Sequence, residues 1–172
     1  MRRGYSREQY LELVGRIRMA MPDVGLTTDI IVGFPGETPE QFERTLDLVR
    51  QVRFDKIHAA MYSPRPGTIA WRKQPDDVSR AEKKRRYRAL EDLQKRISQE
   101  INQALVGVTV DVLIEGKKDE RWHGRTRSNK LVYLDGDRYF GETVTVRITD
   151  ATAWSLQGKS LKSAKKILAI AV

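Results

Sequence analysis

Two stretches of this sequence combine residue types that could bind a ligand. The first is the run Gly-Phe-Pro-Gly-Glu-Thr at residues 33–38, which joins an apolar, β-branched run to the start of a helical pattern. Ligands of α/β folds bind at the edge of the sheet where a strand leads into a helix. Glycines there allow close backbone approach, and the amides of a helix N-terminus attract an anion or a carboxylate. A strand-to-helix turn of this composition also forms without a ligand, so the spacing leaves both interpretations open.

The second stretch, residues 125–130, is typical of an RNA contact. Its basic side chains can pair with phosphates, and its amide and hydroxyl groups can read base edges, while Trp122 and Tyr133 could stack on unpaired bases. The residues that we predict to bind RNA here are Arg125, Thr126, Arg127, Asn129 and Lys130. The rival interpretation is an exposed hairpin charged for solubility, with Trp122 or Tyr133 in the core.

The net charge of +9 is concentrated in the second half of the chain. Residues 1–78 carry a net charge of +1, and residues 79–103 and 104–172 carry +4 each. Such an excess favours a polyanionic partner, although solubility alone also explains it. Basic side chains near residue 80 oppose a helix macrodipole, so we predict RNA contacts for Lys84 and Arg85, with a solvated helix face as the alternative.

The absence of cysteine excludes several classes of chemistry. Disulfides, thiolate zinc sites, cysteine nucleophiles and cysteine-ligated iron–sulfur clusters all require a residue that the sequence lacks. His58 and His123 have no partners in sequence, so we expect neither metal binding nor acid–base catalysis from them, and we predict no metal site and no catalytic residue. No apolar run is long enough to cross a membrane and the first residues do not form a signal peptide, so we expect a soluble, cytoplasmic protein.

The first half of the chain alternates helical and strand patterns. Ser6 begins a helix at residues 7–20, a continuous apolar run at 24–32 predicts a parallel strand buried on both faces, and Thr38 caps a second helix. A second strand follows at 56–62, then an extended proline-rich loop at 63–68 and a polar, turn-like segment at 69–78. This order is typical of a parallel α/β sheet or barrel. Two strands cannot close a barrel, so we expect this half of the chain to be a fragment or a fold that another chain completes.

The second half begins with a long helix and then changes to a period of two. Ser79 starts the helix, and from Val108 onward apolar residues alternate with polar ones in short segments separated by turns. The last predicted strand spans residues 152–156. Five short strands predict a small OB-like antiparallel β-barrel, a fold that commonly binds nucleic acid. The predicted domains are therefore an α/β segment at 1–78, a connector helix at 79–103 and a β-barrel at 104–170.

Three motifs in this order resemble the radical-SAM methylthiotransferases, most closely the tRNA-modifying branch known as MiaB type. They are the stretch at 28–38, the loop at 62–68, and the segment Gly124-Arg125-Thr126-Arg127 followed by Trp154-Ser155-Leu156. The resemblance extends from Met1 to about Gly158. It implies that the first half is the C-terminal part of a TIM-like radical-SAM barrel and that the β-barrel is a TRAM domain, which grips tRNA in that family. Residues 159–172 have no counterpart and are interpreted as a frayed tail or a final strand.

The resemblance also implies a reaction and its cofactors. Members of this branch methylthiolate a prenylated adenosine beside the anticodon, using S-adenosylmethionine and two iron–sulfur clusters. The positions carried over as S-adenosylmethionine contacts are Ile31, Gly33, Tyr62 and Ser63. Because no cysteine is present to hold a cluster that delivers an electron, we expect this chain alone to be inactive, and we expect a stable iron–sulfur signal after reconstitution to be absent.

Three functional interpretations follow. The chain is the C-terminal part of a tRNA methylthiotransferase, acting mainly as a tRNA-binding fragment that needs the missing N-terminal part; or it is a stand-alone RNA-binding module; or it belongs to the related branch that modifies a ribosomal protein. The basic patch at 125–130 favours the first.

Overall fold

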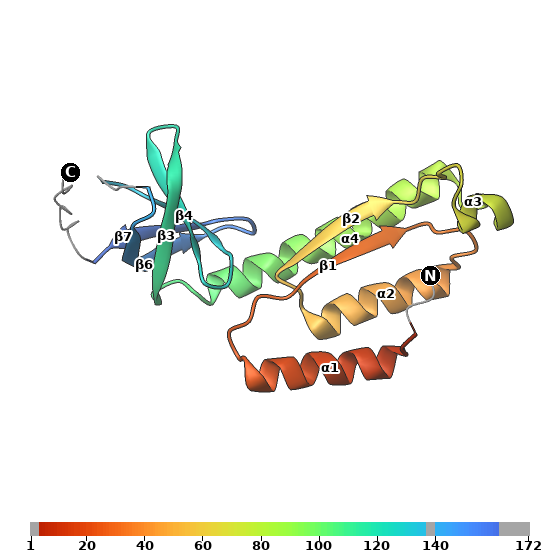
Figure 1. Ribbon diagram of the computed structural model, residues 1–172, viewed down its shortest axis with the longest axis horizontal. Helices are drawn as coiled ribbons and strands as arrows, with labels where there is room; N and C mark the ends of the chain where they lie inside the picture. The colour runs from red at the N-terminus through yellow and green to blue at the C-terminus, as the bar shows by residue number, and fades with distance from the viewer. Residues whose placement is uncertain (1–3, 137–139, 162–172) are drawn as a thin grey trace, which may run out of the picture. The chain divides into compact units, whose positions relative to one another are not determined.

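The computed structural model describes residues 4–136 and 140–161, and its contacts divide the chain into two compact units, Met1–Ser98 and Gln99–Val172. Figure 1 labels most of their helices and strands. Helix α4 (Arg80–Gln103) contributes to both units. In the first unit its buried Gln94 and Ser98 bind the carbonyls of Phe54 and Asp55. Of the segment 159–172, predicted to be a frayed tail or a final strand, residues 159–160 end strand β7 (Leu156–Ser160), and residues 162–172 lie outside the described residues.

The first unit follows the predicted order of helices and strands. Its elements are α1 (Arg7–Ala20), β1 (Thr27–Val32), α2 (Pro39–Val52), β2 (Lys56–Met61), α3 (Ile69–Lys73) and most of α4. Ser6 and Thr38 form the predicted capping boxes with Gln9 and Gln41. The five-residue helix α3 corrects the expectation of a turn-like segment after residue 68, because the Thr68 hydroxyl caps the Trp71 amide and starts a helical turn.

Strands β1 and β2 pair in parallel, as predicted, and lie side by side in Figure 1. Val32, at the end of β1, is fully buried, and α2 contributes a buried stripe, Phe42, Leu46, Val49 and Val52. The prediction that β1 is buried on both faces is wrong. Its alternate residues Asp29 and Ile31 are exposed, so in the described part of the unit only the face that carries Val32 is closely packed.

The second unit contains the predicted five-stranded barrel. Among the described residues, β3 (Thr109–Lys118), β4 (Arg121–Thr126), β5 (Leu131–Leu134), β7 (Leu156–Ser160) and β6 (Thr143–Ala151) close in that order. The barrel is mixed rather than fully antiparallel, since β7 fills the gap between β5 and β6 and runs parallel to β5. Its core comprises buried apolar residues from β3, β5, β6 and β7, and the partly buried Trp122 of β4 packs against them. Gln99 and Asn102 of α4 donate to backbone carbonyls at 151–153 of the same unit.

The last strand lies later in the chain than predicted. Residues 152–155 form a turn in which the Thr152 hydroxyl accepts from the amides of Trp154 and Ser155. Trp154 is consequently exposed and β7 begins at Leu156. The pattern of alternating residues could not distinguish a strand from a threonine turn of similar composition.

Two further sequence expectations concern the whole chain. In the described residues no helix is both long enough and apolar enough to span a bilayer. The division into segments 1–78, 79–103 and 104–170 stays a prediction.

Candidate functional site

The turn at 33–38 is held by the chain's own carboxylates. The Gly33 amide donates to Glu37 Oε2 at 2.6 Å, and the Gly36 amide donates to Asp77 Oδ1 at 2.8 Å. Gly33 has φ +69°, a conformation that favours glycine, and an added Cβ would fall on the Lys83 side chain. Because these amides already have acceptors, the geometry does not support the anion-binding interpretation of the turn. The assignment of Gly33 as a cofactor contact stays a prediction.

A buried ion-pair network ties this turn to helix α4. Arg86, whose side chain is 3% exposed, donates to Glu37 Oε2 at 2.7 Å, to the Glu37 carbonyl at 2.8 Å and to Glu82 Oε1 at 2.8 Å. Lys83, which is also buried, pairs with Asp76 at 2.5 Å. The network explains part of the basic cluster at the start of α4, because two of its cations are neutralised within the fold.

Glu82 carries the largest pKa change in this network. Hydrogen bonds from Arg85 and then Arg86 lower the pKa of Glu82 from 4.5 to about 2. Burial lowers the pKa of Arg86, but its hydrogen bonds to Glu82 and Glu37 outweigh that effect and raise the pKa above its ordinary value.

The low pKa of Glu82 predicts acid sensitivity of the first unit. Because the folded-state pKa lies below the unfolded value of 4.5, the stabilisation is complete above pH 4.5 and is lost as the pH falls toward about 2. We expect the loss to be on the order of 1 kcal/mol, since Glu82 is partly exposed to solvent. Urea denaturation at several pH values should show a steeper acid loss for the wild type than for Glu82→Gln. Equal pH profiles for the two proteins would contradict the prediction.

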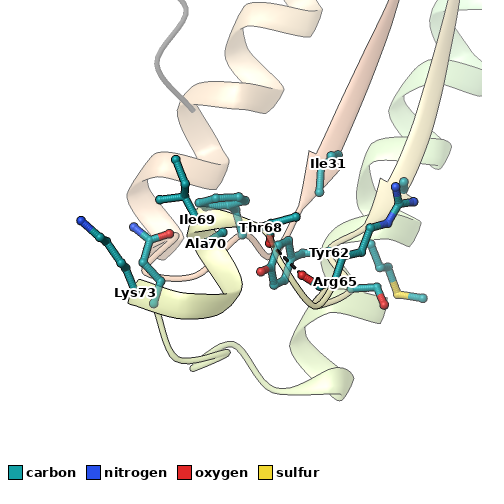
Figure 2. A pocket seen from close by; sticks show the side chains of 12 residues that line it. Ile31, Tyr62, Arg65, Thr68, Ile69, Ala70 and Lys73 are labelled. Atoms are coloured by element: carbon teal, nitrogen blue, oxygen red, sulfur yellow. Dashed lines mark hydrogen bonds between the residues drawn. The ribbon is translucent and has the colours of Figure 1, made fainter.

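A pocket of about 1060 Å³ opens at the carboxyl ends of β1 and β2. Three of the four predicted cofactor residues, Ile31, Tyr62 and Ser63, line it. Figure 2 shows Ile31 at the end of β1, with Tyr62 and Arg65 in the loop after β2 and helix α3 beside them. The Tyr62 ring contacts Phe34 edge-on, with centroids 5.1 Å apart. The pocket lining therefore combines apolar and aromatic side chains with a few polar ones, among them Arg65 and Lys73, a composition typical of small-molecule sites.

Of the two predicted RNA residues on α4, Lys84 is exposed, and in the described structure its ammonium has no acidic partner. Arg85 is 57% exposed but forms a two-pronged hydrogen bond with Glu82 at 2.7 Å. An arginine whose charge is already paired offers less to a phosphate than a free one. The RNA-binding assignments of both residues stay predictions.

The patch at 125–130 forms the hairpin turn between β4 and β5. Arg125 donates to Glu115 Oε2 at 3.3 Å and to both oxygens of Asn129 at 3.2 Å, so these predicted residues are mutually engaged. Arg127 is exposed, and among the described residues it forms no ion pair. Arg127 is therefore the predicted residue here that is most available to a phosphate.

Thr126 and Lys130 hold the hairpin itself. Thr126 is 9% exposed, and its hydroxyl accepts from the Lys130 amide at 3.1 Å and contacts the Ser128 hydroxyl. Asn129 has φ +63°, as a tight turn requires. Thr126 thus has a structural part in the turn, and its contact with RNA stays a prediction.

The structure separates the two aromatic residues near this patch. Trp122 packs against the barrel core. Tyr133 lies on the outside, next to His123 at 6.1 Å between ring centroids and below the guanidinium of Arg121, whose Cζ is 5.6 Å from the Tyr133 ring centroid. Sequence reasoning missed Arg121. The signal that could have found it is its position one residue before Trp122, which places it outside when Trp122 points inward.

A second feature that sequence reasoning missed is a pair of like charges across two strands. Arg147 on β6 is registered with Lys159 on β7, and both side chains are exposed. Neither forms an ion pair within the described part of the chain. Like charges directly opposite one another destabilise a sheet, so a bound anion would relieve repulsion here.

Comparison with known families gives two matches in succession. The Radical SAM superfamily model matches residues 1–49, and the TRAM domain model matches residues 103–161. The second match covers the whole barrel, and the first covers α1, β1 and much of α2.

Individual relatives match most of the chain. A tRNA-2-methylthio-N(6)-dimethylallyladenosine synthase of Dehalococcoides mccartyi is 52% identical over 163 residues, which is 94% of this chain and 39% of the relative. Proteins of the same name from Moorella thermoacetica and Herpetosiphon aurantiacus are 51% and 47% identical, over 92% of this chain and 36% and 37% of their own lengths.

The chain thus spans well under half the length of the curated relatives that it matches. The two family matches occur in the order that the sequence motifs predicted, and the fold supplies the barrel and the parallel α/β segment expected of each. The chain therefore belongs to the radical-SAM methylthiotransferases of the MiaB type, of which it represents a C-terminal part, a radical-SAM segment followed by a TRAM domain.

Proposed function

We propose that this chain is the tRNA-holding part of an enzyme that methylthiolates a prenylated adenosine beside the anticodon. The relatives' name specifies the synthesis of 2-methylthio-N(6)-dimethylallyladenosine in tRNA, and the position beside the anticodon is what the resemblance to the family implies. The observation that carries the proposal for this chain is the outer surface of the TRAM barrel, which presents Arg127, Arg147 and Lys159 without acidic partners among the described residues. Such cations bind a phosphate backbone and release its counterions. We expect the chain to act in the cytoplasm, with the anticodon region of tRNA and an N-terminal part of the enzyme as its partners.

The pocket at the ends of β1 and β2 fits part of S-adenosylmethionine. Its apolar and aromatic lining suits an adenosine, and Ile31, Tyr62 and Ser63 would hold that group, with Gly33 at the adjoining turn. When bound, S-adenosylmethionine supplies the methyl group and the radical chemistry of the family. This chain's residues would orient the nucleoside and exclude water from one side of it.

The chain's residues do not fit an iron–sulfur cluster. The sequence has no cysteine, and in the described residues no group of three or more histidine, aspartate or glutamate side chains could hold a metal ion. We therefore propose that the cluster ligands come from residues outside this chain, and that reconstitution of the chain with iron and sulfide gives no stable visible absorption.

Mobility shift with an unmodified tRNA transcript tests the proposal. We expect binding at low salt that weakens steeply as salt rises, because phosphate contacts dominate. The double variant Arg125→Ala, Arg127→Ala should bind about tenfold or more weakly, with a salt slope lower by about one for each lost phosphate contact.

The matched control is Arg16→Ala, which removes an exposed arginine from α1 and should bind tRNA like the wild type. A chain that fails to bind tRNA at low salt would overturn the proposal. Equal binding of tRNA and of an unrelated duplex RNA would instead favour the stand-alone RNA-binding module, and binding of a ribosomal protein in place of tRNA would favour the related branch.

A further inference from the structure

A strip of registered residues crosses the outside of the TRAM barrel. Gly116, His123, Tyr133 and Gln157 are registered neighbours on β3, β4, β5 and β7. Their alternate neighbours Trp122, Val132 and Leu156 point into the core, so the strip faces outward. Gly116 has no side chain, and the His123 imidazole occupies the space above it, since a Cβ there would lie 3.2 Å from His123 Cε1.

Hydrogen bonds and a ring contact hold the Arg121 side chain in one orientation on this strip. Its Nη2 donates to Gln157 Oε1 at 2.6 Å and its Nε donates to Asp135 Oδ1 at 3.1 Å, while its Cζ lies over the Tyr133 ring. The side chain is nevertheless 39% exposed, so it remains accessible from solvent. Two acceptors and an aromatic ring have already ordered a long side chain, which removes most of the entropy that a ligand would otherwise have to overcome.

The charges on this face are of both signs, since the exposed Asp150 on β6 is registered with Gln157, and the basic groups are of two kinds. The charge of Arg121 is balanced by Asp135. Arg121 therefore offers a ligand mainly the flat surface of its guanidinium and the hydrogen-bond donor Nη1, which neither the Gln157 nor the Asp135 hydrogen bond uses. Arg147 and Lys159 lie opposite each other on β6 and β7, two residues along β7 from Gln157, and have no acidic partner in the described residues. This face thus places the planar guanidinium of Arg121, whose charge is paired, near Arg147 and Lys159, whose charges are not paired in the described residues.

We propose that this face binds a single-stranded segment of RNA, with an unpaired base stacked on the Arg121 guanidinium and Tyr133 behind it, and with the neighbouring phosphates on Arg147 and Lys159. Bases stack on arginine planes and on aromatic rings wherever RNA is read as a single strand. A paired base inside a duplex cannot present its face in this way. The inference deepens the proposed tRNA function and rests on it, because it assigns the barrel an unstacked part of the tRNA rather than a helical stem.

The test uses the full chain, an unmodified tRNA transcript and a short single-stranded RNA that carries 2-aminopurine, whose fluorescence falls when it stacks. Arg121→Lys keeps the charge but removes the plane. We expect this variant to bind both RNAs about tenfold more weakly, to lose the fluorescence quenching at saturation, and to keep the wild-type salt slope. Arg147→Ala should bind more weakly with a salt slope lower by about one and with quenching retained.

Variants of Tyr133 separate stacking from folding. Tyr133→Phe keeps the ring and should bind like the wild type, whereas Tyr133→Leu should lose affinity and quenching, with circular dichroism confirming that both variants fold. A chain that binds tRNA while Arg121→Lys binds and quenches like the wild type would overturn this inference and leave the proposed function standing. A chain that binds no tRNA at all would overturn the proposed function itself.

Discussion

Replacement of Gly124 by alanine should unfold the TRAM barrel. Gly124 lies on β4 opposite Ile114, and a Cβ at this position would fall on the carbonyl oxygen of Leu113 and close to a methyl group of Val112. These atoms belong to the paired strand β3 and its core side chain, so neither can move aside without breaking the pairing. We expect a loss of at least about 3 kcal/mol. A barrel of this size has little stability in reserve, so most of it should be unfolded.

Hydrogen exchange measured by mass spectrometry resolves this effect by segment. The amides of β3 and β4 should lose protection while those of α2 keep it. The matched control is Gly15→Ala in α1, where the added Cβ meets nothing within 4 Å. The same chemical change should stabilise the first unit by about 0.5–1 kcal/mol, because alanine favours a helix interior over glycine. Full protection of β3 and β4 in Gly124→Ala would show that the strand can shift to accommodate the methyl group.

The second large effect is expected from Arg86→Ala, which should destabilise the first unit by about 3–5 kcal/mol. Arg86 is buried and makes hydrogen bonds to two carboxylates and a carbonyl. Its removal leaves the Glu37 carboxylate, 14% exposed, with the Gly33 amide but without a cation. A buried charge without a partner is strongly unfavourable. The turn beside the pocket should also be disturbed, because Glu37 binds the Gly33 amide of that turn.

The neighbouring Arg85 provides the control for this variant. Arg85 also binds Glu82 and also lies near the Phe42 ring, but its side chain is 57% exposed. We expect Arg85→Ala to lower the free energy of unfolding by less than about 1 kcal/mol, since exposed pairs contribute little. Urea denaturation of both variants measures the difference. Similar losses for Arg85→Ala and Arg86→Ala would mean that burial of the pair does not determine its contribution.

The two effects concern different parts of the proposed function. Gly124 maintains the barrel that would hold tRNA, and Arg86 maintains the turn at 33–38 next to the candidate cofactor pocket. We therefore expect Gly124→Ala to abolish tRNA binding, whereas Arg86→Ala should disturb the first unit and leave the barrel contacts in place.

Local patterns in the sequence determined most of the elements. The capping boxes at Ser6 and Thr38 predicted the starts of α1 and α2 because their hydrogen bonds span only three residues. The period of two after Val108 predicted the barrel strands for a similar reason, since alternation is a property of each strand by itself. The order of motifs also predicted the family that the comparisons show. None of these inferences required knowledge of contacts between distant residues.

The tertiary structure decided what depends on contacts between distant segments. Arg86 and Glu37 are far apart in the chain, so sequence alone could not show that part of the basic cluster on α4 is neutralised inside the fold. Likewise, β7 could be assigned a parallel partner only after β5 and β6 were in place. Side-chain alternation left open whether Trp122 or Tyr133 faced the core, and closure of the barrel resolved it. That closure puts Trp122 inside and Tyr133 outside beneath Arg121, because the register across four strands fixes which face each side chain takes.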